Sequence, residues 1–132
     1  MYQFFRKEFE EIKRSGILLP DEEYFGLLQA VQAVMTLTTD NHTMQRGACE
    51  AVWLGKPIIT SDWPILKEYF DKGTIHVDNS AQSIREAVIK MQKEREKLED
   101  EILILQQERW QEWQDKYLVL TQLIENSLSW AK

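Results

Sequence analysis

The sequence predicts an α/β protein with a partial parallel sheet of about four short strands, flanked by helices and followed by a long C-terminal helical tail. Three observations lead to this prediction. Short apolar runs alternate with amphipathic stretches over residues 17–78, as in parallel strands joined by helices. All five Gly and all three Pro precede residue 74. Beyond it, apolar residues recur at three- and four-residue spacing with no helix breaker among them.

Each predicted element has a local signal. Apolar or β-branched runs predict short buried strands over 17–19, 33–39, 58–61 and 75–78. Amphipathic stretches, some opened by Pro or by acidic residues, predict helices over 2–14, 20–31, 44–54 and 62–70. Side-chain oxygens at the starts of helices predict N-caps at Thr43, at Ser61 or Asp62, and at Asn79 or Ser80.

The tail begins at Ala81 and has an apolar stripe at heptad-like spacing. As one helix it would extend roughly 80 Å, too long to lie on so small a sheet. It therefore either bends into a hairpin near 93–100 or projects and packs on another domain or chain. We expect a sheet domain over 1–79 and a helical tail over 80–132, and the tail could pair with a second copy or with a missing N-terminal domain.

Composition excludes several classes of protein. Sixteen Lys and Arg against 22 Asp and Glu give a net charge of −6, which argues against nucleic-acid binding. One Cys and two distant His do not form the ligand spacing of a zinc site. The sequence also contains no P-loop and no glycine motif for dinucleotide binding. No apolar run is long enough to span a bilayer. We therefore expect a cytoplasmic protein that touches a membrane surface, if at all, through a partner or substrate.

The candidate site lies where a loop opens a helix behind an apolar strand, a place that favours phosphate. Glu50 could accept hydrogen bonds from ribose hydroxyls or form an ion pair with Arg46 four residues earlier. Arg46 could equally bind a diphosphate. Gly47 could allow close approach of a ligand or of a neighbouring strand. His42 could donate a hydrogen bond to phosphate or sugar, or be a solvated loop residue.

The segment 50–62, with Glu50 five residues before Gly55-Lys56-Pro57 and an apolar strand after it, resembles the nucleotide-binding signature of GT-B glycosyltransferases of the large retaining family. The resemblance covers roughly residues 15–92. It implies a Rossmann-like donor domain in which Glu50 binds the ribose of a nucleotide-diphosphate sugar. It also implies that the backbone amides of Thr43, Met44, Gln45 and Arg46 face the phosphate and sugar of the donor, with Gly47 beside them.

The sequence also departs from this family. His42 stands where many members have a second Glu, eight positions before the ribose Glu. The resemblance does not include the family's acceptor domain or the first half of its donor domain, which carries a basic pair for the diphosphate. We therefore expect a C-terminal fragment of a glycosyltransferase that is inactive alone, with no cofactor beyond the donor. The alternatives are a non-catalytic interaction module that oligomerises through its tail and, more weakly, a nucleotide-sugar epimerase-like protein.

Overall fold

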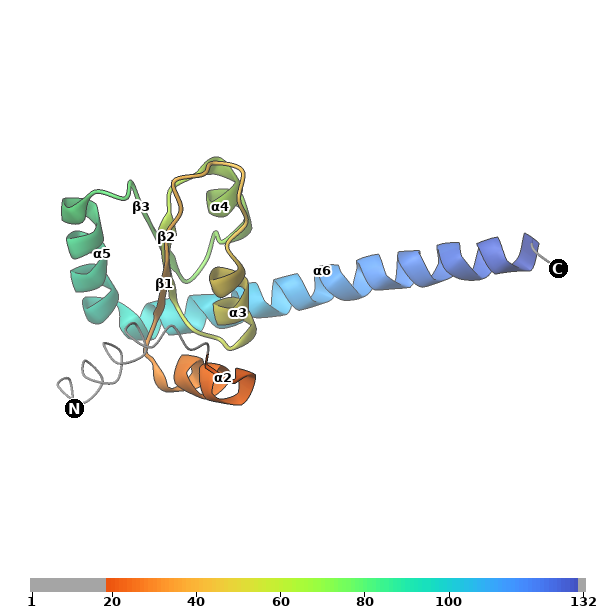
Figure 1. The fold of residues 1–132 in the computed structure, drawn as a ribbon, viewed down its shortest axis with the longest axis horizontal. Coiled ribbons are helices and arrows are strands. Elements are labelled where there is room, and N and C mark those ends of the chain that lie inside the picture. The colour runs from red at the N-terminus through yellow and green to blue at the C-terminus, as the bar shows by residue number, and fades with distance from the viewer. Residues whose placement is uncertain (1–18, 131–132) are drawn as a thin grey trace. The chain divides into compact units, whose positions relative to one another are not determined.

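A computed structural model describes residues 19–130 of the chain (Figure 1). The chain divides into two units after Ala30. The described part of the first unit contains helix α2 (Asp21–Ala30), which has three acidic residues in its first turn and Leu28 buried. The helix predicted over 2–14 and most of the strand predicted over 17–19 lie outside the described residues. The fourth strand therefore stays a prediction.

The second unit contains a three-stranded parallel sheet in the order β1-β2-β3. Its strands are β1 (Val34–Thr36), β2 (Ile58–Ser61) and β3 (Thr74–Val77). Ile58 on the central strand aligns with the first residue of each neighbouring strand. Every residue of β2 is buried, which explains why its first three residues are all β-branched rather than alternating with polar ones. The parallel sheet expected from the alternation of elements is confirmed.

Helices connect the strands and cover both faces of the sheet. Helix α3 (Arg46–Trp53) joins β1 to β2, and α4 (Pro64–Tyr69) joins β2 to β3. After the sheet come α5 (Ala81–Lys93) and α6 (Arg95–Trp130). One core cluster unites α3, α4 and α6, and a second lies under α5. The first contains Ala48, Ala51, Val52, Ile58, Leu66, Phe70, Ile102 and Leu105. The second contains Ile59, Val77, Ala87, Met91 and Leu98.

The predicted helix caps have mixed outcomes. The cap at Ser80 is confirmed, because its hydroxyl accepts a hydrogen bond from the Ser83 N–H at 3.1 Å. The cap at Thr43 is wrong, because α3 begins two residues later with Gln45 at its N-cap. Gln45 makes no side-chain capping bond, since its Oε1 accepts from the Thr36 hydroxyl at 2.6 Å.

The N-cap of α4 is Trp63, so the predictions of Ser61 and Asp62 are also wrong. Ser61 ends strand β2, where its side chain bonds to the segment that follows β1. The position is thus used by the sheet rather than by the helix. Pro64, with its preset backbone angle, begins α4 without a side-chain cap.

The tail both bends and projects. It breaks at Glu94, the C-cap of α5, which lies inside the predicted region 93–100. Helix α6 then continues for 36 residues, about 54 Å at the α-helical rise. In Figure 1, α5 and α6 run in different directions rather than side by side, so the tail is not a hairpin. Beyond residue 110 the apolar side chains of α6 are largely exposed.

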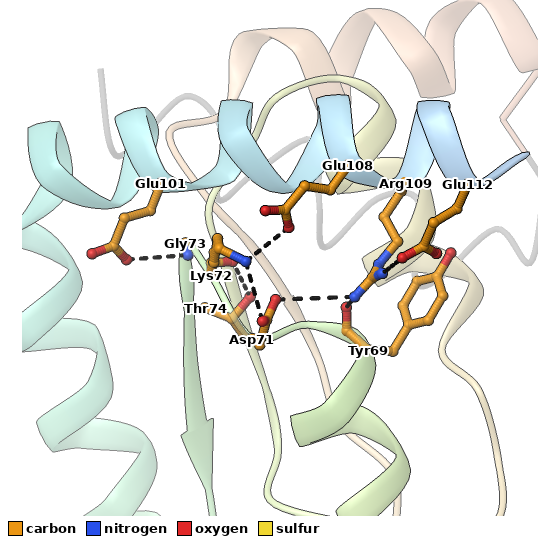
Figure 2. A network of polar contacts seen from close by, with 9 residues as sticks. All are labelled: Tyr69, Asp71, Lys72, Gly73, Thr74, Glu101, Glu108, Arg109 and Glu112. Carbon is orange, nitrogen blue, oxygen red and sulfur yellow. Dashed lines mark hydrogen bonds and ion pairs between the residues drawn. The ribbon is translucent and has the colours of Figure 1, made fainter. Parts of the chain in front are cut away.

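Polar contacts fasten the first half of α6 to the segment between α4 and β3 (Figure 2). The guanidinium of Arg109 donates to the Tyr69 carbonyl oxygen at 2.8 and 3.2 Å and lies over the Tyr69 ring. The Lys72 ammonium donates to Glu108 at 2.7 Å and to Asp71 at 3.2 Å. Hydrogen bonds of both side chains raise the pKa of Lys72. These bonds set the direction in which α6 leaves the domain.

Gly73 is the point of closest approach between the sheet and α6. Its φ is +61°, a left-handed value that disfavours any residue with a Cβ. A Cβ built on Gly73 would lie 2.5 to 2.7 Å from the Cβ, N and Cα atoms of Ile102. Since Gly73 immediately precedes β3, α6 crosses at the amino ends of the strands.

Candidate functional site

The predicted site lies at the carboxyl edge of the sheet, at the end opposite α6. Strand β1 ends at Thr36, a loop follows, and α3 begins at Arg46. The hydrogen bond from Thr36 to Gln45 ties the start of α3 directly to the end of β1. This is the strand–loop–helix arrangement that the sequence predicts. It brings His42, Thr43, Met44, Gln45, Arg46, Gly47 and Glu50 into one continuous segment.

Arg46 and Glu50 form an ion pair across one turn of α3, with Arg46 Nε 2.7 Å from Glu50 Oε1. The Arg46 side chain is 88% exposed, whereas that of Glu50 is only 14% exposed. An i, i+4 pair with one partner in solvent contributes about 0.3–0.5 kcal/mol. The ion pair predicted from the spacing is confirmed.

Gly47 faces the end of β1 without being forced to be glycine. A Cβ at this position would lie 3.7 Å from the Cβ and Oγ1 atoms of Thr36, an ordinary van der Waals distance. Close packing against the neighbouring strand therefore does not require glycine here. The other interpretation, close approach of a ligand, stays a prediction.

The loop before α3 is organised by Asp40. Its carboxylate accepts from the His42 backbone N–H at 2.8 Å, and its own N–H donates to the Thr38 hydroxyl at 3.0 Å. The His42 backbone bond, followed by a bond from the Thr43 hydroxyl, lowers the pKa of Asp40. His42, Thr43 and Met44 are all exposed. The loop is thus held by local hydrogen bonds and presents these three side chains to solvent.

A buried polar network at the same edge was not predicted. Ser61 is fully buried, and its Oγ accepts from the Thr38 N–H at 2.9 Å and lies 2.7 Å from Asn79 Oδ1. The Thr38 carbonyl oxygen accepts from Asn79 Nδ2 at 2.8 Å and from Trp63 Nε1 at 2.9 Å. The network joins the segments that follow β1, β2 and β3. It therefore holds the loop that leads to α3.

The sequence did contain a signal for this network. Ser61 ends β2 and Asn79 follows β3, and the carboxyl ends of parallel strands meet at one edge of a sheet. Asn79 also has a φ of 68°, a left-handed conformation that Asn tolerates better than most residues. The sequence predicts Ser61 as a strand end or a helix cap and Asn79 as a helix cap, and it does not predict the bond between them.

The segment Gly55-Lys56-Pro57 has a structural role at the amino end of the sheet. Gly55 has a φ of +67°, and the N–H of Lys56 donates to the Ala51 carbonyl oxygen at 2.8 Å, ending α3. The Pro57 carbonyl oxygen accepts from the Val34 N–H at 2.9 Å. The part of the signature with the most distinctive sequence thus forms a turn, and it lies at the end of α3 away from the predicted site.

Other sites find little support among residues 19–130. A pocket of about 340 Å³ lies between α3 and α6, lined by Trp53, Gln106, Gln107 and Trp110, and includes none of the predicted site residues. In the described part of the chain, no group of three or more His, Cys, Asp or Glu side chains is placed to hold a metal ion. Within the same part, every helix is too short or too polar to cross a lipid bilayer.

The remaining titratable groups lie in packed positions. His76, on β3, is partly buried, and its Nε2 lies 3.3 Å from the Leu66 carbonyl oxygen. Burial lowers the pKa of His76. Cys49 packs against the core beneath α3, and burial raises the pKa of its thiol. Neither group points to a reaction.

Comparison with known protein families, with curated proteins and with solved structures gave no match for this chain.

Proposed function

We propose that this chain carries part of a donor site for a nucleotide-diphosphate sugar, at the carboxyl edge of its sheet, and belongs to a GT-B type glycosyltransferase. The observation that supports this most is the position of Glu50. Its carboxylate is mostly buried, lies one turn into the helix that opens at this edge, and is held by a weak ion pair. Ligands of open parallel α/β sheets bind at this edge.

The start of α3 is suited to the diphosphate. The N-cap side chain of Gln45 is bound to Thr36 and does not cover the first-turn amides. Those amides and the helix dipole favour an anion at this end. Arg46, whose guanidinium is exposed, can reach either Glu50 or a phosphate oxygen.

Glu50 is suited to the ribose. An ionised carboxylate offers two acceptor oxygens, which matches the two hydroxyl donors of a ribose. When Arg46 turns to the diphosphate, the hydroxyls can replace its hydrogen bond to Glu50. The same two residues would then contact adjacent parts of one nucleotide. The base, the sugar and the acceptor are not specified by these residues.

We expect the chain alone to bind nucleotide weakly and to transfer no sugar. In such sites, catalysis comes from positioning and from stabilisation of the departing diphosphate by helix termini and cations. The described residues at this edge include Arg46 but no second basic side chain in the segment 36–50. Sugar transfer by the purified chain would contradict this expectation.

The test is a titration with UDP, GDP and ADP followed by amide NMR shifts. We expect one of them to bind with a Kd of about 1 mM, shifting the amides of residues 43–50. Glu50→Ala should abolish this binding, and Arg46→Ala should weaken it. Glu86→Ala, which removes an exposed carboxylate from α5, is the matched control and should leave it unchanged. Absence of binding by all three nucleotides, or equal loss in the control, would refute the proposal.

A further inference from the structure

The distal half of α6 presents a continuous row of exposed apolar side chains. Before Arg109 the apolar face of this helix is buried, with Leu98, Ile102 and Leu105 in the core clusters. Beyond it, five apolar residues at helical spacing are 50% to 63% exposed, and we call them the distal stripe. The distal stripe consists of Trp113, Tyr117, Leu120, Ile124 and Leu128.

The spacing of the distal stripe is that of a helix–helix seam. Its members are separated by four, three, four and four residues, so they fall within about 80° of one another around the helix axis. The 4-3-4 spacing of Trp113, Tyr117, Leu120 and Ile124 is the heptad pattern of coiled-coil pairing, and Leu128 lies one position beyond the next heptad site. Leu118, which is 57% exposed, lies about 100° from Tyr117 and outside the stripe. The distal stripe is thus the longest regular row of apolar side chains on this part of the helix, and Val119 and Leu123, 57% and 58% exposed, lie outside it as Leu118 does.

The start of the distal stripe is held in place by stacked aromatic rings. Trp53 of α3 contacts Trp110 at a centroid distance of 5.2 Å, and Trp110 stacks on Trp113 at 5.4 Å. Trp113 in turn stacks on Tyr117 at 5.1 Å. Each ring therefore supports the next along the start of the stripe. Together with the Arg109 contacts they orient the stripe before any partner arrives.

The area of the stripe suits a second copy. Five half-exposed large side chains leave roughly 500 Å² of apolar surface per chain, so two copies would bury about 1,000 Å², the size at which specific interfaces begin. The charge of this segment disfavours two other kinds of partner, anionic lipid and nucleic acid. Residues 112–128 contain Glu112, Asp115 and Glu125 against Lys116, a net charge of −2, which opposes anionic lipid and nucleic acid.

We propose that the distal stripe pairs with the same segment of a second copy of this chain in an antiparallel helical dimer. A two-fold axis between Leu120 and Thr121 places Trp113 opposite Leu128 and Tyr117 opposite Ile124. The bulky aromatic end of each stripe then packs on the aliphatic end of the other.

The position of the domains favours the antiparallel direction. A parallel pair would bring the two domains, each fastened to the first half of α6, to the same end of the coiled coil, whereas an antiparallel pair places them at opposite ends.

Sedimentation equilibrium on the full chain tests the dimer. The wild-type chain should show a monomer–dimer equilibrium. Leu120→Glu in the distal stripe should weaken dimerisation at least about 100-fold, as expected for a charge introduced into a packed interface. Leu118→Glu is the matched control, since this residue has similar exposure on the same helix but lies outside the stripe, and it should dimerise like the wild type. Far-UV circular dichroism verifies that both variants fold.

The proposal is wrong if the wild-type chain is a concentration-independent monomer, or if both substitutions weaken dimerisation equally. A monomer that binds neutral lipid vesicles would also overturn it. The dimerisation constant is measured in the absence of nucleotide, so the result of this test does not depend on whether the donor site exists.

Single-cysteine cross-linking tests the direction. In a Cys49→Ala background, Thr121→Cys and Gln114→Cys lie one heptad apart beside the stripe. An antiparallel dimer brings the two copies of residue 121 together at the axis and separates the two copies of residue 114 by roughly 20 Å. We expect a covalent dimer only with Thr121→Cys. Cross-linking at both positions would show a parallel pair and would refute the antiparallel arrangement.

Discussion

Replacing Gly73 by Ala should destabilise the sheet unit more than any other glycine substitution in it. The added Cβ would lie 2.5 Å from Ile102 Cβ and 2.6 Å from Ile102 N, and the backbone of α6 cannot rotate away as a side-chain tip can. A left-handed φ costs a residue with a Cβ about 1–2 kcal/mol. Overpacking typically adds about 1–3 kcal/mol. The free energy of unfolding should therefore fall by about 2–5 kcal/mol.

Urea denaturation followed by tryptophan fluorescence and far-UV circular dichroism measures this change. With a typical slope of about 2 kcal/mol per molar urea, the midpoint should fall by about 1–2.5 M. Gly47→Ala is the matched control, because its Cβ would meet Thr36 at an ordinary 3.7 Å inside a helix. It should be neutral or stabilise by up to about 1 kcal/mol. Gly55→Ala should fall between them, because its close contact is the flexible tip of Leu103.

A wild-type midpoint for Gly73→Ala would refute the reasoning, because it would mean that α6 does not press on the start of β3. Equal destabilisation by Gly47→Ala would show that the distance from the added Cβ to its neighbours does not predict the loss of stability at these glycines. A midpoint that falls together with a changed slope would instead show that the substitution altered the folded or unfolded state as a whole.

Three further substitutions test other parts of the structure. Ser61→Ala should lower the free energy of unfolding by about 1–3 kcal/mol, measured by urea denaturation, because buried groups of Thr38 and Asn79 lose a partner. Arg109→Lys should lower the free energy of unfolding by about 1 kcal/mol in the same assay, because a Lys ammonium cannot reproduce the two hydrogen bonds of the guanidinium to the Tyr69 carbonyl oxygen. An unchanged midpoint would show that these two bonds do not contribute to stability. Burial lowers the pKa of His76 below its usual 6.5, so the unfolded chain binds the proton more readily and stability falls as pH drops through that region. His76→Gln should flatten this part of the stability–pH curve, and an identical curve would contradict the assignment.

Much of the sheet unit could be predicted from the sequence because its signals are local. A β-branched run such as residues 58–61 predicts a buried strand whatever surrounds it, and Ser80 caps α5 through a bond to a residue three positions on. The caps at Thr43 and Ser61 were wrong for a related reason. Local spacing predicts that each side chain caps the helix that follows it, whereas Ser61 forms a hydrogen bond with Thr38, 23 positions earlier in the chain. Contacts of that kind leave no periodic trace in the sequence.

The sequence by itself determined the order of the elements, the parallel sheet and the apolar stripe of the tail, because each depends on spacing along the chain. Only the tertiary structure decided that Arg46 pairs with Glu50, that Glu50 is mostly buried while Arg46 is exposed, and that Gly47 is not required by packing. It also decided that α6 crosses the amino ends of the strands, away from the candidate site. The helix can approach there because Gly73 has no Cβ to collide with Ile102. These features arise where distant segments meet, and their distances are set by packing rather than by spacing.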